Sequence, residues 1–158
     1  MGRAFVERGD GALDPLPDLP LSPHPNYVTP RGLAALQDRL RALQTNLATL
    51  KARPDRLDKL PEAAAERDIR YIEARLRSAI EIDTTNQPLS AAAFGLAITV
   101  ADTHGLETTY EITGEDEADA RLHRISPYAP LARALIGAQV GDEVIWRKPS
   151  GPVTLEIL

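Results

Sequence analysis

Three carboxylates near the middle of the chain, Asp55, Asp58 and Glu62, have the type and spacing that could support an acidic function. They are interleaved with cations that would partly neutralise them, namely Arg53, Arg56 and Lys59. Charges that alternate in sign over so short a stretch are typical of a solvated, exposed turn. The sequence therefore allows two interpretations, a working acidic cluster and a simple polar turn, and it favours the second.

Composition excludes or disfavours several other chemistries. The chain has no cysteine, which excludes disulfides and thiolate chemistry. Its three histidines are scattered without ligand spacing, so we expect no histidine metal site. A net charge of −5 argues against a general nucleic-acid binder. No apolar run approaches membrane-spanning length and the N-terminus lacks the apolar core of a signal peptide, so a cytoplasmic protein without a membrane partner is expected.

The elements that must position the carboxylates are indicated by a long apolar repeat. Leucines recur at alternating spacings of three and four from Leu33 to Leu50, the seam of a coiled coil. A second seam follows at Ile69, Ile72, Leu76 and Ile80, with Ala65 and Ala79 in line. Two such seams separated by a short break predict an antiparallel helical hairpin over residues 29–83, since the apolar side chains of each seam would otherwise stay exposed to water. An ordinary packed helical pair remains the alternative to a projecting finger.

Local signals mark the ends of the two predicted helices. Thr29 is a suitable N-cap, and Pro30 then occupies the first helical position, where its missing N–H costs nothing. Pro54 and Pro61 predict that the first helix ends near Arg53 and that the second begins near Pro61. Each arm would then have about 22 residues and a length of ~33 Å. The three carboxylates would lie at the tip of this hairpin.

The rest of the chain divides into three further segments. Residues 1–28 form an acidic, proline-rich extension, either a disordered tail or an arm laid over another part of the protein and anchored by Ala4-Phe5-Val6. Residues 84–93 are a linker, and residues 94–158 a small body. The hairpin is mildly basic, with eleven Lys or Arg against eight Asp or Glu over residues 30–82, whereas residues 83–158 carry five against eleven.

The body is expected to be an antiparallel sheet with one short helix, which makes the whole chain an α+β protein. The strands are predicted at residues 96–100, 108–113, 122–125, 143–148 and 153–158, and the helix at residues 130–136. The acidic run Gly114-Glu115-Asp116-Glu117 is predicted to be a solvated loop. The last two strands should be joined by the turn Pro149-Ser150-Gly151-Pro152, whose prolines and glycine are not expected to continue either strand.

The most specific motif of the chain is the C-terminal run from Ile125 to Gly137, followed by Val140-Gly141-Asp142-Glu143-Val144. It resembles the C-terminal signature of the GreA/GreB family of bacterial transcription elongation factors. Others similar in order and spacing are Thr29-Pro30-Arg31-Gly32, residues 69–76, Glu81-Ile82-Asp83, Phe94-Gly95, residues 110–119 and Pro149-Ser150-Gly151. Together they cover about residues 27–158.

The resemblance implies a coiled-coil finger followed by a C-terminal domain of FKBP-like fold that binds RNA polymerase core at its secondary channel. In members that stimulate cleavage, acidic fingertip residues help to hold Mg²⁺ and a water in the polymerase active site, a task for hard oxygen ligands. The protein would thus be no enzyme itself and would need no cofactor of its own, with at most indirect contact to polymerase Mg²⁺. The expected polymerase contacts are Tyr128, Ala129, Pro130 and Arg133.

Two departures from the family pattern bear on function. The acidic tip motif of the family is missing, and the hairpin is roughly fifteen residues short, which removes ~10 Å of reach as in the Rnk-type relatives. The polymerase-contacting loop, which tends to be Asp-Ser-Pro in the family, is Tyr128-Ala129-Pro130 here. We therefore expect a regulator that binds polymerase without efficient transcript cleavage. The alternatives are a cleavage-stimulating factor that uses Asp58 and Glu62, and a peptidyl-prolyl isomerase, for which the aromatic residues are few.

Overall fold

The computed structural model describes residues 15–158 and divides into two compact units. The helical unit consists of residues 15–23 and 37–77, and the sheet unit of residues 24–36 and 78–158. None of the helices in the described part of the chain is long and apolar enough to cross a membrane.

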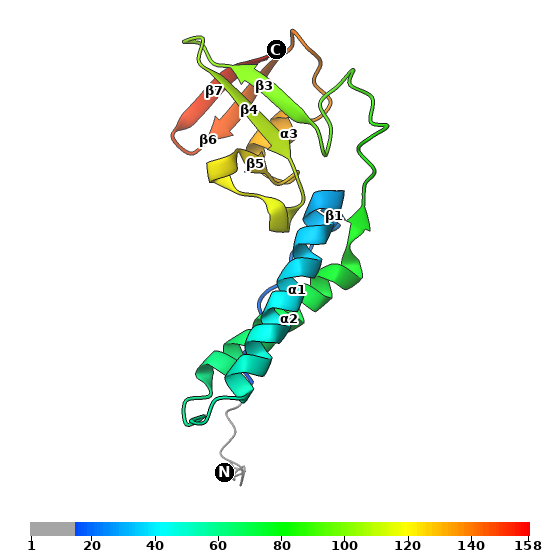
Figure 1. Cartoon of the computed structure of the whole chain (residues 1–158). Helices are drawn as coiled ribbons and strands as arrows, with labels where there is room; N and C mark the ends of the chain where they lie inside the picture. Colours follow the sequence, from blue (N-terminus) through cyan, green and yellow to red (C-terminus); the bar gives the residue numbers. More distant parts are fainter. Residues whose placement is uncertain (1–14) are drawn as a thin grey trace, which may run out of the picture. The chain divides into compact units, whose positions relative to one another are not determined.

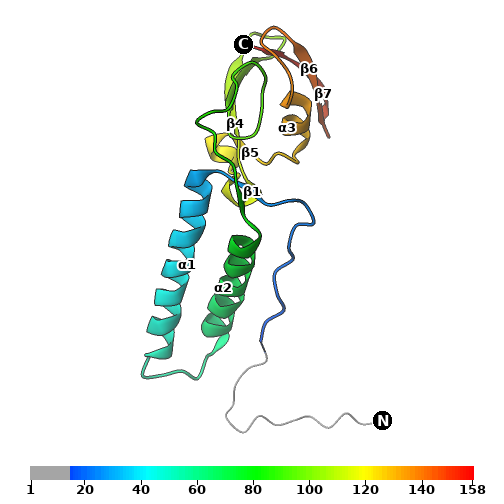
Figure 2. The same ribbon diagram turned by 90° about the vertical axis from the view of Figure 1, so that its right-hand side faces the viewer.

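Two long helices, α1 (Pro30–Lys51) and α2 (Leu60–Ser78), lie side by side, and most of their residues belong to the helical unit (Figure 1 and Figure 2). The boundaries match those predicted from the prolines to within two residues. Thr29 caps α1 as expected, because its hydroxyl oxygen accepts a hydrogen bond of 2.9 Å from the N–H of Gly32. Since α1 begins in the sheet unit and continues into the helical unit, this cap belongs to the sheet unit.

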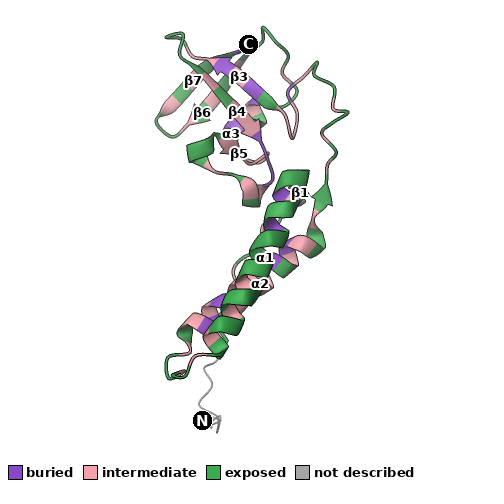
Figure 3. Ribbon diagram, in the orientation of Figure 1, coloured by how far each residue is buried: buried purple, intermediate pink, exposed green. Residues whose placement is uncertain are grey.

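Within the two helices, the predicted seams fall on buried or half-buried positions. Leu36 and Ile72 are buried, and the other leucines of the α1 seam are half-buried. Most of α1 is exposed in Figure 3, whereas α2 buries the small residues Ala63 and Ala65 as well as Ile72. Ala79 and Ile80 were assigned to the seam wrongly, because both lie beyond the end of α2, and Ile80 is exposed in strand β2.

The second seam ends early because the chain pairs with the extension at that point. Strand β1 (Tyr27–Val28) runs parallel to β2 (Ile80–Glu81), and the N–H of Ile80 donates to the carbonyl of Asn26 at 2.8 Å. The described part of the extension is therefore an arm laid on the protein, the second of the two alternatives. In the helical unit, Arg70 of α2 donates to the carboxylate of Asp18 and to the carbonyl of Leu16. The expected anchor Ala4-Phe5-Val6 lies outside the described residues.

The sheet unit contains a five-stranded sheet in the order β5-β4-β3-β7-β6. Its elements are β3 (Ala97–Ala101), β4 (Glu107–Ile112), β5 (Arg124–Ile125), α3 (Pro130–Leu135), β6 (Glu143–Lys148) and β7 (Gly151–Ile157), with short 3₁₀ turns at Glu115–Glu117 and Ala120–Leu122. Leu131 and Leu135 of α3 join Ile98, Val100, Ile112, Leu155 and Ile157 in one buried core. The α+β class is confirmed.

Two details of the sheet differ from expectation. The strand β5 pairs with β4 in parallel, so the sheet is mixed rather than wholly antiparallel. The strand β7 begins at Gly151, opposite Lys148, and includes Pro152, so the turn is shorter than predicted. Pro152 is tolerated because β7 pairs with β3 only at its other end, at Glu156 and Ile157, and no ladder from β3 needs the missing N–H.

Candidate functional site

The predicted carboxylates lie in a tip cluster, which we define as Arg53, Asp55, Arg56, Asp58, Lys59 and Glu62, around the loop between α1 and α2. Glu62 stands in the first turn of α2 and is buried, with a side chain only 7% exposed. The guanidinium of Arg56 donates two hydrogen bonds of 2.8 Å to it, one to each carboxylate oxygen. This two-pronged geometry is the strongest form of arginine–carboxylate pairing. Arg53 adds a longer ion pair at 3.7 Å.

The other two carboxylates shape the loop itself. An oxygen of Asp55 accepts a hydrogen bond of 2.9 Å from the N–H of Leu57, and an oxygen of Asp58 accepts one of 3.0 Å from the N–H of Leu60. Both are bonds to a backbone N–H two residues further on, the pattern of an Asx turn. The second bond also satisfies a donor at the start of α2. All three predicted carboxylates thus have structural partners in the loop.

The electrostatics of the tip cluster favour the ionised form of Glu62. The hydrogen bonds from Arg56 lower the pKa of Glu62 below its ordinary value, with smaller contributions from the charges of Arg53 and Lys59. The same pair raises the pKa of Arg56. No group of three or more acidic or histidine side chains converges as a metal site within residues 15–158. The arrangement can hold the loop in shape, because both oxygens of Glu62 and one oxygen each of Asp55 and Asp58 accept hydrogen bonds within it.

The expected contacts in the sheet unit lie around the start of α3, and we call Tyr128, Ala129, Pro130 and Arg133 the docking loop. Ala129 is the N-cap of α3 and Pro130 follows at the first helical position. The hydroxyl of Ser126 accepts a hydrogen bond of 3.1 Å from the N–H of Tyr128, which fixes the approach to the helix. Pro130 and Arg133 are exposed, whereas Tyr128 and Ala129 are half-buried.

Sequence reasoning missed a partner of the docking loop. The ring of His24 stacks on that of Tyr128, with centroids 4.1 Å apart and planes at 17°. The hydroxyl of Tyr128 donates to the carbonyl of Pro25 at 2.7 Å. No local pattern could have revealed this contact, because it joins residues about a hundred positions apart.

A second missed feature is a polar hub at the start of α1, formed by Thr29, Arg31, Glu111 and Glu117. Glu117 accepts a hydrogen bond of 2.6 Å from the hydroxyl of Thr29, and Arg31 donates to both Glu117 and Glu111. These contacts raise the pKa of Arg31, the hydrogen bond to Glu117 most of all. The Glu117 side chain is only 7% exposed, so the prediction of a solvated acidic loop was wrong at this residue. Its charge is neutralised by the end of α1 that it holds.

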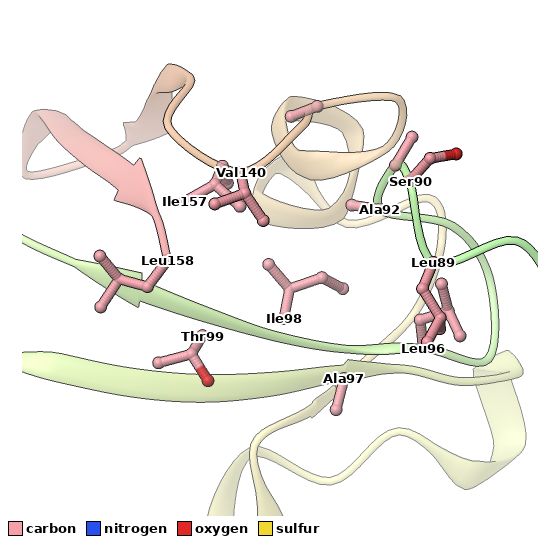
Figure 4. Close-up of a pocket in the computed structure, with 12 residues that line it drawn as sticks. Leu89, Ser90, Ala92, Leu96, Ala97, Ile98, Thr99, Val140, Ile157 and Leu158 are labelled. Carbon is pink, nitrogen blue, oxygen red and sulfur yellow. The ribbon is translucent and has the colours of Figure 1, made fainter.

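The sheet unit also has an apolar groove of about 330 Å³ (Figure 4). It is lined by β3, by the segment around Leu89 and Ala92, by Val140 and by the C-terminal Ile157 and Leu158. The lining side chains are aliphatic, small or hydroxylic. The aromatic residues of the unit pack elsewhere: Tyr110 meets Trp146 edge-on at 6.3 Å, and Lys148 lies 4.6 Å from the Trp146 ring.

Comparison with known proteins decides the family. A model of the C-terminal part of the GreA/GreB transcription elongation factors matches residues 87–158. The chain is also 36% identical over 155 residues to the transcription elongation factor GreA of Legionella pneumophila (strain Corby), with 87% of this chain and 96% of that protein covered. The chain belongs to the GreA/GreB family. Identity rises to 52% over 93 residues with the GreA of Francisella philomiragia subsp. philomiragia, where 57% of this chain matches 58% of that protein.

The GreA/GreB match covers only one of the two candidate sites, the docking loop. The matched segment 87–158 contains the docking loop and the whole five-stranded sheet, but none of the tip cluster. A solved GreA/GreB structure from Nitrosomonas europaea aligns with 84% of this chain and 96% of its own at 20% identity, with a TM-score of 0.41. With so low a TM-score, the position of no residue in this chain is inferred from that structure.

Proposed function

We propose that this protein is a GreA/GreB-type elongation regulator that binds RNA polymerase core at the secondary channel and modulates transcription without efficient transcript cleavage. The sheet unit supplies the binding contacts through the docking loop, and the tip cluster enters the channel. Any magnesium ion involved belongs to the polymerase active site. The chain acts on a polymerase, and it is not itself the catalyst.

The observation that best supports the proposed lack of efficient cleavage is the pairing of Glu62 with Arg56. A carboxylate that helps to hold Mg²⁺ must turn an oxygen toward the ion, because such ions are bound by oxygen ligands at about 2 Å. Both oxygens of Glu62 are engaged by Arg56, and Asp55 and Asp58 accept from backbone N–H groups. Releasing Glu62 would leave the Arg56 guanidinium without its partner and the loop without its brace. The missing family tip motif supports the same conclusion.

Family membership and the docking loop support the binding half of the proposal. The segment that matches the GreA/GreB C-terminal model includes Pro130 and Arg133, which are exposed and held on a rigid helix start. An exposed cation and an exposed proline on a fixed element are better suited to binding a protein surface than to binding a small ligand. A peptidyl-prolyl isomerase is less well supported, since the apolar groove has no aromatic lining residue.

Two measurements with purified components test the proposal. Binding of the full chain to RNA polymerase core is expected at low salt, and its absence would refute the proposal. RNA release from a stalled, backtracked complex should stay near the level of polymerase alone. The double variant Asp58→Ala, Glu62→Ala should behave like the wild type in this assay. Strong RNA release that the double variant loses would instead establish a cleavage factor.

A further inference from the structure

The N-terminal extension supplies a residue next to the docking loop. His24 is exposed, and its ring covers one face of Tyr128 at 4.1 Å. The Tyr128 hydroxyl is committed to the carbonyl of Pro25. A partner that approaches this side of the loop therefore meets the imidazole of His24 before it meets the covered face of Tyr128.

The backbone around His24 is fixed by bonds on its C-terminal side. The side-chain amide of Asn26 donates to the hydroxyl of Ser78 at 3.1 Å, and the backbone carbonyl of Asn26 accepts from the N–H of Ile80. Asn26 is buried, and β1 follows directly in its pairing with β2. A ring held on a fixed backbone loses little conformational entropy when it becomes part of an interface. The stack is therefore a built part of the sheet unit.

We propose that His24 is a partner-contacting residue of this protein, and that Tyr128, which the sequence led us to expect as a contact itself, is instead a positioning residue that acts by holding His24. The inference rests on the proposed function and deepens it, since the partner is the protein surface of RNA polymerase core. The complementary patch should offer a flat group, such as a peptide plane or an aromatic ring, against the imidazole and a carboxylate for Arg133 of the docking loop.

Binding of full-length variants to polymerase core tests the assignment. His24→Ala should weaken binding roughly tenfold, the size of effect that a well-placed interface residue gives. His104→Ala is the matched control, because His104 is an exposed histidine in the turn after β3 and should leave binding unchanged. Since His24 is exposed, its removal should not alter the circular dichroism spectrum.

A double-mutant cycle separates contact from positioning. Tyr128→Ala should weaken binding as much as His24→Ala, and the double variant should be no weaker than either, because the two act as one unit. Tyr128→Phe keeps the stack and loses only the bond to Pro25, so its effect should be smaller. Additive losses in the double variant would overturn the positioning role of Tyr128.

The outcomes distinguish this inference from the proposed function. If the wild-type chain does not bind polymerase core, the proposed function fails. If the wild type binds and His24→Ala binds equally well, only the inference fails. Tighter binding by His24→Ala would also overturn it, since the extension would then cover the docking loop rather than complete it.

Discussion

Glu62 shows how one pairing decides what a charged residue can do. The side chain is buried beside Arg56, and the two hydrogen bonds hold it ionised. A free carboxylate at the same place could bind a cation, whereas the paired one serves as a brace for the loop. The difference lies in the residue six positions upstream, not in Glu62 itself.

The brace should make the helical unit sensitive to acid. Because the folded pKa of Glu62 is lowered, its contribution to stability is present above its ordinary pKa of 4.5 and is lost as the pH falls through the folded value. Glu62→Gln should lower the midpoint of thermal unfolding at neutral pH, and the gap to the wild type should close below pH 4.5. Circular dichroism melts over that range provide the measurement. Glu73→Gln, an exposed change in the same helix, should show no gap at either pH.

At the scale of elements, the two units depend on separate cores. Ile72 is fully buried in the helical unit, whereas Ile112, Leu135 and Val100 are fully buried in the sheet unit. The only tryptophan, Trp146, lies on β6 and packs against the sheet core, so its fluorescence reports on that unit. Circular dichroism in the helical region reports mainly on α1 and α2. The two probes can therefore assign a destabilising change to one unit.

Truncation of a buried side chain in the helical unit should lower the stability of that unit and leave the sheet unit largely unchanged. Ile72→Ala is expected to destabilise the helical unit by about 2–5 kcal/mol, through lost burial and a residual cavity. Urea unfolding should show a larger shift by circular dichroism than by Trp146 fluorescence. Leu57→Ala, at a side chain that is 92% exposed in the tip loop, should stay within about 0.5 kcal/mol of the wild type. Equal shifts by both probes would mean that the units unfold together.

The second prediction at the scale of elements concerns the close packing between β1 and the loop after β4. A Cβ added at Gly114 would lie 2.5 Å from the carbonyl oxygen of Tyr27, and backbone atoms cannot move aside cheaply. Gly114→Ala should therefore destabilise the sheet unit by about 1–3 kcal/mol. Trp146 fluorescence in urea measures this loss. Ala118→Ser, an exposed change in the same loop, is the control, and a wild-type midpoint in Gly114→Ala would contradict the packing.

At the scale of the whole molecule, charge is divided between the middle of the chain and its C-terminal half. Residues 30–82 have a small excess of Lys and Arg, and residues 83–158 have a large excess of Asp and Glu. A large charged partner can orient such a molecule before contact, and salt screens the effect over distances of about 10 Å. Orientation by charge changes the rate of association more than the lifetime of the complex.

The association with polymerase core that we propose should accordingly depend on salt. The association rate is expected to fall by about tenfold or more between low and high ionic strength, while the dissociation rate changes little. Stopped-flow or surface-based kinetics can resolve the two rates. Arg39→Gln in α1 and Glu107→Gln in β4, both at exposed positions, should shift the association rate in opposite directions. Shifts in the same direction would rule out orientation by the field of the chain.

The sequence by itself determined the helical pair and the α+β class, because heptad spacing, caps and prolines act on neighbouring residues. It also indicated the family, through the C-terminal motif from Ile125 to Val144. It also placed five strands and α3 nearly where they lie. Only the tertiary structure decided which charges and rings meet. Arg56 pairs with Glu62 through the path of the tip loop, Glu117 is neutralised by Arg31 from the start of α1, and Tyr128 meets the extension 103 residues away. Local patterns cannot specify such pairs, since folding of the chain chooses among many nearby partners of the same type.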